Sequence, residues 1–156
     1  MEKIPRGTHG FTLIEMVVTI LIVSILAVFA TARLDLGAFE EAGFFQQSST
    51  AIRYAQKLAI GSNCSVRVQV ASSGCFLSWN VCGAASGNSI VNPATGLSDF
   101  CASSAATVAP SADFSFDNIG RPVQTADTDI VLAVQNFTIG SRTIRVEAET
   151  GYSHEP

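Results

Sequence analysis

A single carboxylate interrupts the longest apolar run of the chain. Residues 11–32 read FTLIEMVVTILIVSILAVFATA and contain no charged residue other than Glu15, and neither glycine nor proline. An ionised carboxylate at the centre of a membrane helix costs ~2.5–3.5 kcal/mol on insertion scales, and less near one end of the helix. Glu15 therefore needs either a positively charged partner or a place at the membrane interface where its carboxylate reaches water.

Four cysteines, Cys64, Cys75, Cys82 and Cys101, all follow the apolar run. They include no Cys-x-x-Cys pair and neither histidine is near them in sequence, so a zinc site is not indicated. An even number of cysteines in an exported domain favours two disulfides, with four reduced thiols as the alternative. We predict Cys64–Cys75 at the base of a hairpin and Cys82–Cys101 across a loop, although the sequence leaves three connectivities open.

Two arginines near the C-terminus, Arg142 and Arg145, are candidate contacts for the phosphates of DNA. Glu147, Glu149 and Glu155 stand close to them in sequence and would repel phosphate. A solvated strand face with ion pairs across neighbouring strands is the favoured alternative. The formal charge of −4 also lacks the broad basic footprint of a nucleic-acid-binding protein, so nucleic acid is a secondary hypothesis.

No catalytic pattern stands out along the chain. There is no Gly-x-Ser-x-Gly, no glycine-rich phosphate loop before a helix, and no histidine beyond residue 10 except His154. We therefore expect a protein that is not an enzyme and that uses neither a metal nor another cofactor.

The elements that must position these residues begin with the apolar run. Its 22 residues make ~33 Å of helix at ~1.5 Å each, enough to cross a bilayer. The preceding residues 1–10, MEKIPRGTHG, are polar and basic, whereas a secretory signal would place its cleavage site after the apolar stretch. Lys3 and Arg6 mark the cytoplasmic side by the positive-inside bias. We expect a single span, with the N-terminus inside and the rest of the chain outside.

Residues 33–62 predict an amphipathic continuation of the helix. Gly37 and Gly43 cost roughly 1 kcal/mol each relative to alanine, so a bend or weak point is expected there. A stop is predicted at residues 61–63, Gly-Ser-Asn. Small and apolar side chains recur at steps of three and four and define one packing face: Phe44, Ser48, Ala51, Ala55 and Leu58, widened by Ile52 and Ala59.

Residues 63–156 predict a globular β-rich domain, which completes an α+β architecture of one long helix packed on an antiparallel sheet. Residues 64–70 alternate in polarity, and residues 75–81 return after a turn as the second arm of a hairpin. Residues 83–112 lack periodicity and are expected to be irregular. Further strands are expected at residues 114–116, 130–134, 136–139 and 143–149.

The junction Gly10-Phe11-Thr12-Leu13-Ile14-Glu15, with the apolar helix after it, resembles the cleavage and methylation motif of type IV pilins and type II secretion pseudopilins. The resemblance combines a glycine before an aromatic residue, a glutamate five residues into the mature chain, a basic leader and the apolar run. Residues 51–70 and the stretch FSFDNIGRPV at 114–123 are similar to the GspH/FimT group of minor pilins and pseudopilins. Ala32 departs from the helix-kinking proline of many pilins, so no kink is assumed there.

The resemblance implies that prepilin peptidase cleaves between Gly10 and Phe11 and methylates the new amine of Phe11. Glycine suits this position because it lacks the Cβ that would resist an extended backbone in the peptidase. In the assembled filament, Glu15 would pair with the N-terminal amine of a neighbouring subunit. A plain membrane anchor after a linker glycine is the alternative, but it leaves Glu15 unexplained.

The implied partners are prepilin peptidase, other pilin or pseudopilin subunits and inner-membrane lipid. The subunit would hold its globular domain in the periplasm before it enters a pilus or pseudopilus. FimT-like relatives bind DNA through basic residues near their C-terminus, which makes a DNA-binding minor pilin for DNA uptake the alternative function, with Arg142 and Arg145 as its contacts.

Overall fold

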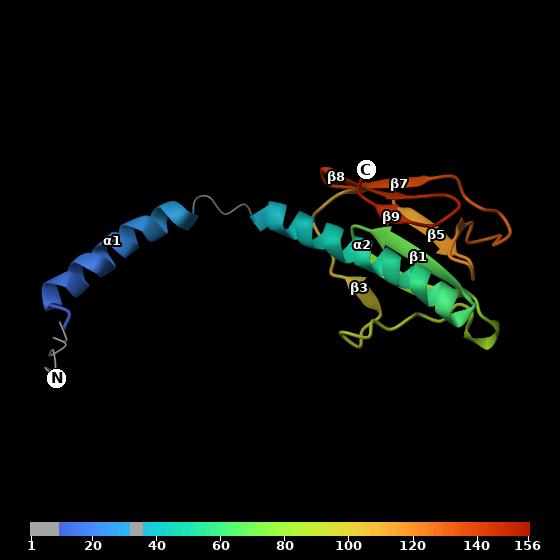
Figure 1. The fold of residues 1–156 in the computed structure, drawn as a ribbon, viewed down its shortest axis with the longest axis horizontal. Helices are drawn as coiled ribbons and strands as arrows, with labels where there is room; N and C mark the ends of the chain where they lie inside the picture. Colours follow the sequence, from blue (N-terminus) through green and yellow to red (C-terminus); the bar gives the residue numbers. More distant parts are fainter. Residues whose placement is uncertain (1–9, 32–35) are drawn as a thin grey trace, which may run out of the picture. The chain divides into compact units, whose positions relative to one another are not determined.

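The computed structural model describes residues 10–31 and 36–156, which fall into two compact units (Figure 1). The first unit contains helix α1 (Leu13–Thr31). The second contains helix α2 (Leu36–Ser62), a short 3-10 helix η1 (Gly83–Ala85) and the strands β1 to β9. The strands pair antiparallel in two sheets, so the predicted α+β class is confirmed. In the described part of the chain, no helix combines the length and the hydropathy that crossing a membrane requires.

Helix α2 buries one face and exposes the other. Gln46, Arg53 and Lys57 are exposed, whereas the predicted packing face is buried except for half-buried Leu58. Much of the buried face consists of alanine and serine, which lets the helix backbone approach the strands closely. Both Gly37 and Gly43 lie inside α2, so the predicted weak point does not interrupt the helix. The helix ends at Ser62, within the predicted stop, and Asn63 follows with a φ of 55°.

The first sheet has the strand order β3-β2-β1-β5-β6. Strands β1 (Ser65–Ala71) and β2 (Gly74–Val81) form the predicted hairpin, joined at Ser72 and Ser73. Strand β5 (Ala112–Phe116) pairs with the other edge of β1. The inward side chains of these strands belong to the core cluster that includes the packed face of α2, namely Val66, Val68, Val70, Leu77, Phe114 and Phe116.

The second sheet has the order β4-β7-β8-β9. Its two longer strands are β7 (Gln135–Ile139) and β8 (Arg142–Val146), which pair directly. Their buried side chains join the same core cluster, namely Phe137, Ile139, Ile144 and Val146. Helix α2 contacts both sheets, so a single helix face closes one core over them.

The strands at the edges of both sheets are short. They are β3 (Asp99–Cys101) and β6 (Pro122–Val123) in the first sheet, and β4 (Val108–Ala109) and β9 (Ser153–His154) in the second. The inner strands β1, β2, β5, β7 and β8 contain between 5 and 8 residues each.

Two of the expectations about secondary structure are wrong. Residues 83–112 are not wholly irregular, because they contain η1, β3 and β4. Strands of two or three residues are too short to show a two-residue period, so the sequence could not mark them. No strand is found at residues 130–134 of the described chain, where an isolated bridge joins Val131 to Val123. Leu132 N–H donates to the carbonyl of Pro122 at 2.8 Å, so this segment lies beside β6 without extending the sheet.

The four cysteines form two disulfides, but the predicted pairing is wrong. Cys64 is joined to Cys82, with Cα atoms 5.0 Å apart, and Cys75 to Cys101, with Cα atoms 4.9 Å apart. Cys75 lies beside the turn of the hairpin, whereas Cys64 lies at its open end, across from Cys82. Cys75 and Cys101 are partners in the β2–β3 ladder and lie in the core, where the hydroxyl of Ser48 is 3.2 Å from the sulfur of Cys75.

The FDNIG sequence after β5 forms a tight turn around one buried carboxylate. Asp117 accepts hydrogen bonds from Ile119 N–H at 3.1 Å, Arg121 N–H at 2.7 Å and Arg121 Nε at 2.8 Å. Gly120 has a φ of 87°, and a Cβ at this position would stand 2.8 Å from Cδ1 of Ile60. The turn thus favours glycine for its backbone angle, whereas the end of the exposed Ile60 side chain could shift to admit a Cβ.

We expect the two disulfides to differ in their contribution to stability. The chain lengths between the paired cysteines, 18 and 26 residues, give similar loop-closure contributions of ~3 kcal/mol each. The buried pair also fills core volume, so Cys75→Ala/Cys101→Ala should cost about 1–3 kcal/mol more than the matched variant Cys64→Ala/Cys82→Ala. Thermal unfolding of both double variants measures this difference. Equal losses, or free thiols found by non-reducing peptide mapping of the parent, would contradict the assignment.

Candidate functional site

The N-terminal junction lies in exposed backbone immediately before α1. Gly10, Phe11 and Thr12 precede the helix, and the side chain of Phe11 is 76% exposed. No other part of the described chain comes within 4 Å of the place where a Cβ of Gly10 would stand. Gly10 and Phe11 are therefore both exposed in the described chain, as the residues of a proteolytic site must be.

Thr12 caps the start of α1 and places Glu15 in its first turn. The N–H of Glu15 donates to Oγ1 of Thr12 at 3.3 Å, and the N–H of Met16 donates to the carbonyl of Thr12 at 3.2 Å. A carboxylate in the first turn interacts favourably with the positive end of the helix dipole. The sequence Thr12-Leu13-Ile14-Glu15 is the pattern of a capping box, a signal that our sequence analysis did not use.

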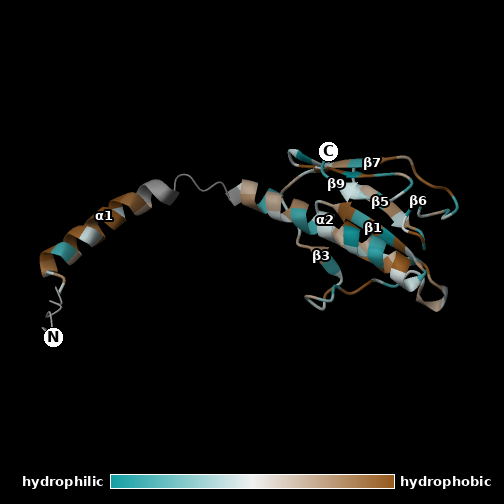
Figure 2. Cartoon of the chain, in the orientation of Figure 1, coloured by the Kyte–Doolittle hydropathy of each residue, from teal (hydrophilic) through white to brown (hydrophobic). Residues whose placement is uncertain are grey.

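The surface of α1 is apolar and uncovered. Figure 2 shows hydrophobic residues along the helix, and the large apolar side chains from Leu13 to Leu26 are between 44% and 83% exposed. Soluble monomers rarely expose contiguous apolar surface of this kind, which marks an interaction site for protein or lipid. Glu15 is the one charged side chain within this stretch. Helix α1 therefore combines an apolar surface with a single carboxylate, that of Glu15, in its first turn.

The two candidate DNA contacts, Arg142 and Arg145, both lie on β8, and each faces a carboxylate. Arg142 donates from Nε and Nη2 to the two carboxylate oxygens of Glu155, at 2.9 and 2.6 Å. This pairing raises the pKa of Arg142 and lowers the pKa of Glu155. Nε of Arg145 is 2.7 Å from a carboxylate oxygen of Glu147. A phosphate would have to displace both carboxylates. Arg142 pairs across strands with the residue after β9, whereas Arg145 pairs with a residue two positions along its own segment, so the ion pairing expected across strands is found for Arg142 alone of these two.

Arg142 has two further interactions that the sequence did not suggest. Its guanidinium lies 3.8 Å from the ring centroid of Phe45 on α2, a cation–π geometry. The charge of Glu41, also on α2, acts on Arg142 and raises its pKa further. The carboxylate of Glu41 itself accepts hydrogen bonds from the N–H and the hydroxyl of Ser141, at 2.7 and 2.9 Å. Arg142 therefore fastens β8 to the first half of α2, which is a structural role.

The described residues offer little for catalysis or metal binding. No group of three or more His, Cys, Asp or Glu side chains suited to a metal is found within residues 10–31 and 36–156. All four cysteines are committed to disulfides, and the ring of His154 stacks on that of Tyr152 with the centroids 5.1 Å apart. The N-terminal junction and α1 are the arrangement with the clearest chemical purpose.

Comparison with protein families identifies a match in this same region. Residues 5–31 match the family described as the prokaryotic N-terminal methylation motif. No curated protein and no solved structure matches the chain. The motif indicates a type IV pilin-like substrate of prepilin peptidase. It implies processing by that peptidase, anchoring in a membrane and assembly with other pilin subunits into a pilus, which is a structural role.

Charge removal tests whether Arg142 and Arg145 contact DNA. If they did, Glu147→Gln/Glu155→Gln would free both guanidinium groups and strengthen salt-dependent binding to duplex DNA roughly tenfold or more. Because Phe45 and the charge of Glu41 still act on Arg142 after both pairs are removed, we expect the parent to bind weakly and the double variant to gain less than threefold, roughly 0.6 kcal/mol. Fluorescence anisotropy with labelled duplex at two salt concentrations measures both proteins. A large gain that Arg142→Gln abolishes would favour the DNA-binding alternative.

Proposed function

We propose that this chain is a minor pilin or pseudopilin of the GspH/FimT group, which joins or primes a pilus or a type II secretion pseudopilus. The observation that supports the proposal most directly is the uncovered apolar surface of α1, with Glu15 in its first turn. A compact α+β unit with its own core follows as the part of the subunit displayed outside the helical filament centre. Within this group, the sequence pattern of the chain is similar to that of MshC, a minor pilin of the mannose-sensitive haemagglutinin pilus. A pilus of that type is therefore the machine that we propose for it.

In this proposal, residues 1–10 are a leader and residues 11–32 anchor the subunit in the inner membrane. The anchor crosses once, with Lys3 and Arg6 on the cytoplasmic side and the domain from residue 63 onward in the periplasm. Residues 33–62 continue the helix into that domain. Prepilin peptidase removes the leader after Gly10 and methylates the amine of Phe11. The exposed, non-helical backbone at this junction is compatible with entry into a protease site.

Assembly then depends on the carboxylate of Glu15. In a lone subunit within the membrane, the carboxylate is hydrated at the interface or protonated, because an isolated buried charge is costly. In a filament, the apolar helices pack together and exclude water from their surroundings. The N-terminal amine of a neighbouring Phe11 then supplies the opposite charge, and the pair is stabilised in the low dielectric of the packed helices. The charge therefore favours the assembled state and sets the axial position of one helix against the next.

The mature chain is expected to begin at Phe11. Intact-mass analysis and N-terminal sequencing of protein extracted from peptidase-competent cells measure this directly, and a mass increase of one methyl group would report methylation. Gly10→Val should leave the leader uncleaved, because a branched side chain obstructs the extended backbone at that position. A chain that keeps Met1 in competent cells would overturn the pilin proposal.

Removing the carboxylate should impair assembly while sparing the fold. Glu15→Leu is expected to leave leader cleavage and the second unit intact, and to ease insertion by up to about 3 kcal/mol. Its entry into filaments should fall roughly tenfold or more. The measurement is a blot of membrane and sheared-filament fractions from cells with equal expression, with Leu26→Ile as a control on the same helix. Equal recovery of Glu15→Leu and parent in filaments would show that the carboxylate of Glu15 serves only as an anchor at the membrane interface and has no role in assembly.

A further inference from the structure

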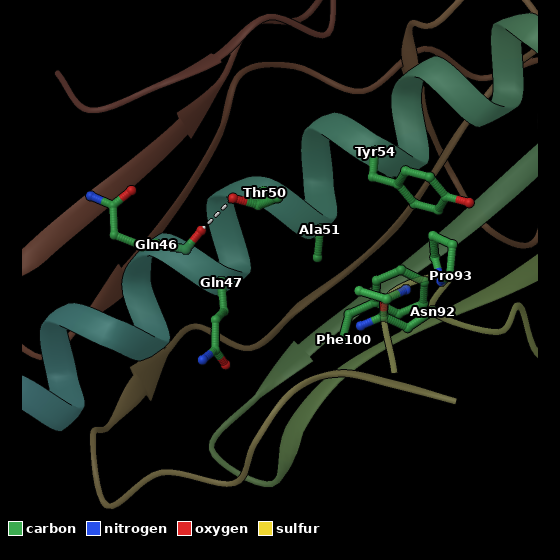
Figure 3. A pocket seen from close by; sticks show the side chains of 9 residues that line it. Gln46, Gln47, Thr50, Ala51, Tyr54, Asn92, Pro93 and Phe100 are labelled. Atoms are coloured by element: carbon green, nitrogen blue, oxygen red, sulfur yellow. Dashed lines mark hydrogen bonds between the residues drawn. The ribbon is translucent and has the colours of Figure 1, made fainter. Parts of the chain in front are cut away.

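A cavity beside α2 is not accounted for by assembly through α1. It has a volume of about 420 Å³ and lies between the helix and the segment that leads into β3 (Figure 3). Its walls are α2 residues between Gln46 and Tyr54, residues 92–94, and Phe100 of β3. This volume falls within the range of small-molecule sites. The contributing segments are far apart in sequence, so the cavity exists only in the folded second unit.

Two aromatic rings form part of the wall. Tyr54 and Phe100 are half-buried, with ring centroids 5.5 Å apart and an interplanar angle of 31°. Neither ring is fully enclosed by the core, so each keeps accessible edge or face. A ring face with its negative quadrupole attracts polarised C–H groups, and the C–H face of a pyranose is such a group. Ala51 and Pro93 extend the apolar lining around these rings.

Side chains with amide or hydroxyl groups line other parts of the same cavity. Gln47 accepts the Ala102 N–H through Oε1 at 3.2 Å, and this bond leaves its two amide N–H donors free to meet a ligand. Asn92 accepts the Ala94 N–H through Oδ1 at 3.0 Å, which holds the loop wall in place. Thr50 donates its hydroxyl to the Gln46 carbonyl at 2.8 Å and retains its oxygen as an acceptor. Amides and hydroxyls that offer both donors and acceptors suit the adjacent hydroxyls of a sugar.

The absence of charge narrows the class of ligand. The residues that line the cavity include no acidic or basic side chain. The whole of segment 83–112, which supplies one wall, contains a single charged residue, Asp99. A phosphate, carboxylate or ammonium ligand would lose hydration on entering and gain no opposite charge. The cavity therefore favours an uncharged ligand.

The edge of β3 also bears on the shape of the ligand. An extended peptide could bind here by adding a strand to this edge, which is one common mode of peptide recognition. However, the side chains of Gln47 and Asn92 already bond to the edge, at Ala102 N–H and at the carbonyl of Asp99. A peptide strand would have to displace both.

From the aromatic wall, the free amide donors and the lack of charge, we propose that this cavity binds a neutral sugar of one or two pyranose rings.

The test uses the full chain, solubilised in a zwitterionic detergent that has no sugar headgroup. Saturation-transfer NMR with methyl β-D-glucopyranoside and methyl β-D-galactopyranoside detects binding, and titration gives an apparent affinity. Gln47→Glu retains the oxygen that accepts Ala102 N–H but replaces the amide donors with a charge. Tyr54→Leu removes a ring while keeping an apolar side chain. Gln124→Glu is the matched control, because Gln124 is exposed and does not line the cavity.

Transfer from the protein to at least one of the two neutral sugars is expected for the parent and for Gln124→Glu. Gln47→Glu and Tyr54→Leu should each weaken binding about tenfold, with melting curves showing that both variants stay folded. Glucuronic acid, the charged counterpart, should bind at least tenfold more weakly than the glucoside. No transfer to either neutral sugar at tens of millimolar would overturn the proposal. Equal binding by all variants, equal binding of glucuronic acid, or selective binding of an uncharged extended peptide would do the same.

Discussion

The packing of α2 across two sheets is the contact on which the second unit depends. Ile52, Ala55 and Ala59 are fully buried, and small side chains along this face bring the helix close to the strands. Neither sheet has another helix over its core face within the described residues, so the loss of α2 would expose the cores of both to water. Hydrogen bonds beside the buried face of the helix add to this packing, since the side chain of Gln56 donates to the carbonyls of Gly120 and Thr150. The helix therefore sets where the two sheets, the C-terminal segment and the cavity wall lie.

Periodicity predicts the longer elements that pack on this core and misses the strands of two or three residues. The stripe on α2 and the alternation in β1 arise from repeated burial on one face, so the sequence alone reveals both. Strands β3 and β4 are held by pairing with distant strands, and so local sequence carries no trace of them. The disulfide pairing depends on the register of the hairpin: the turn at Ser72 and Ser73 places Cys75 near the turn, and a register shift between Ser65 and Val66 brings Cys64 to Cys82. Counting outward from that turn places Cys64 opposite Val81, and only the register shift between Ser65 and Val66 moves it opposite Cys82, so the turn alone would not have predicted the pair.

The N-terminal motif and the sites formed by distant segments also differ in how far the sequence alone predicts them. The N-terminal motif consists of consecutive residues, Gly10 to Glu15, so it can be read without a fold, and the structure adds only the cap supplied by Thr12. The environment of Arg142 could not be read in this manner, because Phe45 and Glu155 reach it from opposite ends of the second unit's sequence. The cavity wall likewise joins α2 to Phe100 across a long stretch of chain. A site that distant segments form can be recognised only from the tertiary structure.

The short edge strands have a consequence for a domain that is held close to other pilin subunits. Long, flat sheet edges are templates for intermolecular pairing and hence for aggregation. Here β6 begins with Pro122, which has no backbone N–H to offer, and β3 is bonded by the side chains of Gln47 and Asn92. Strands β4 and β9 span only two residues each. Domains held at high local concentration would thus resist pairing of their strands with those of neighbouring domains. Contacts between subunits would then be made by their helices.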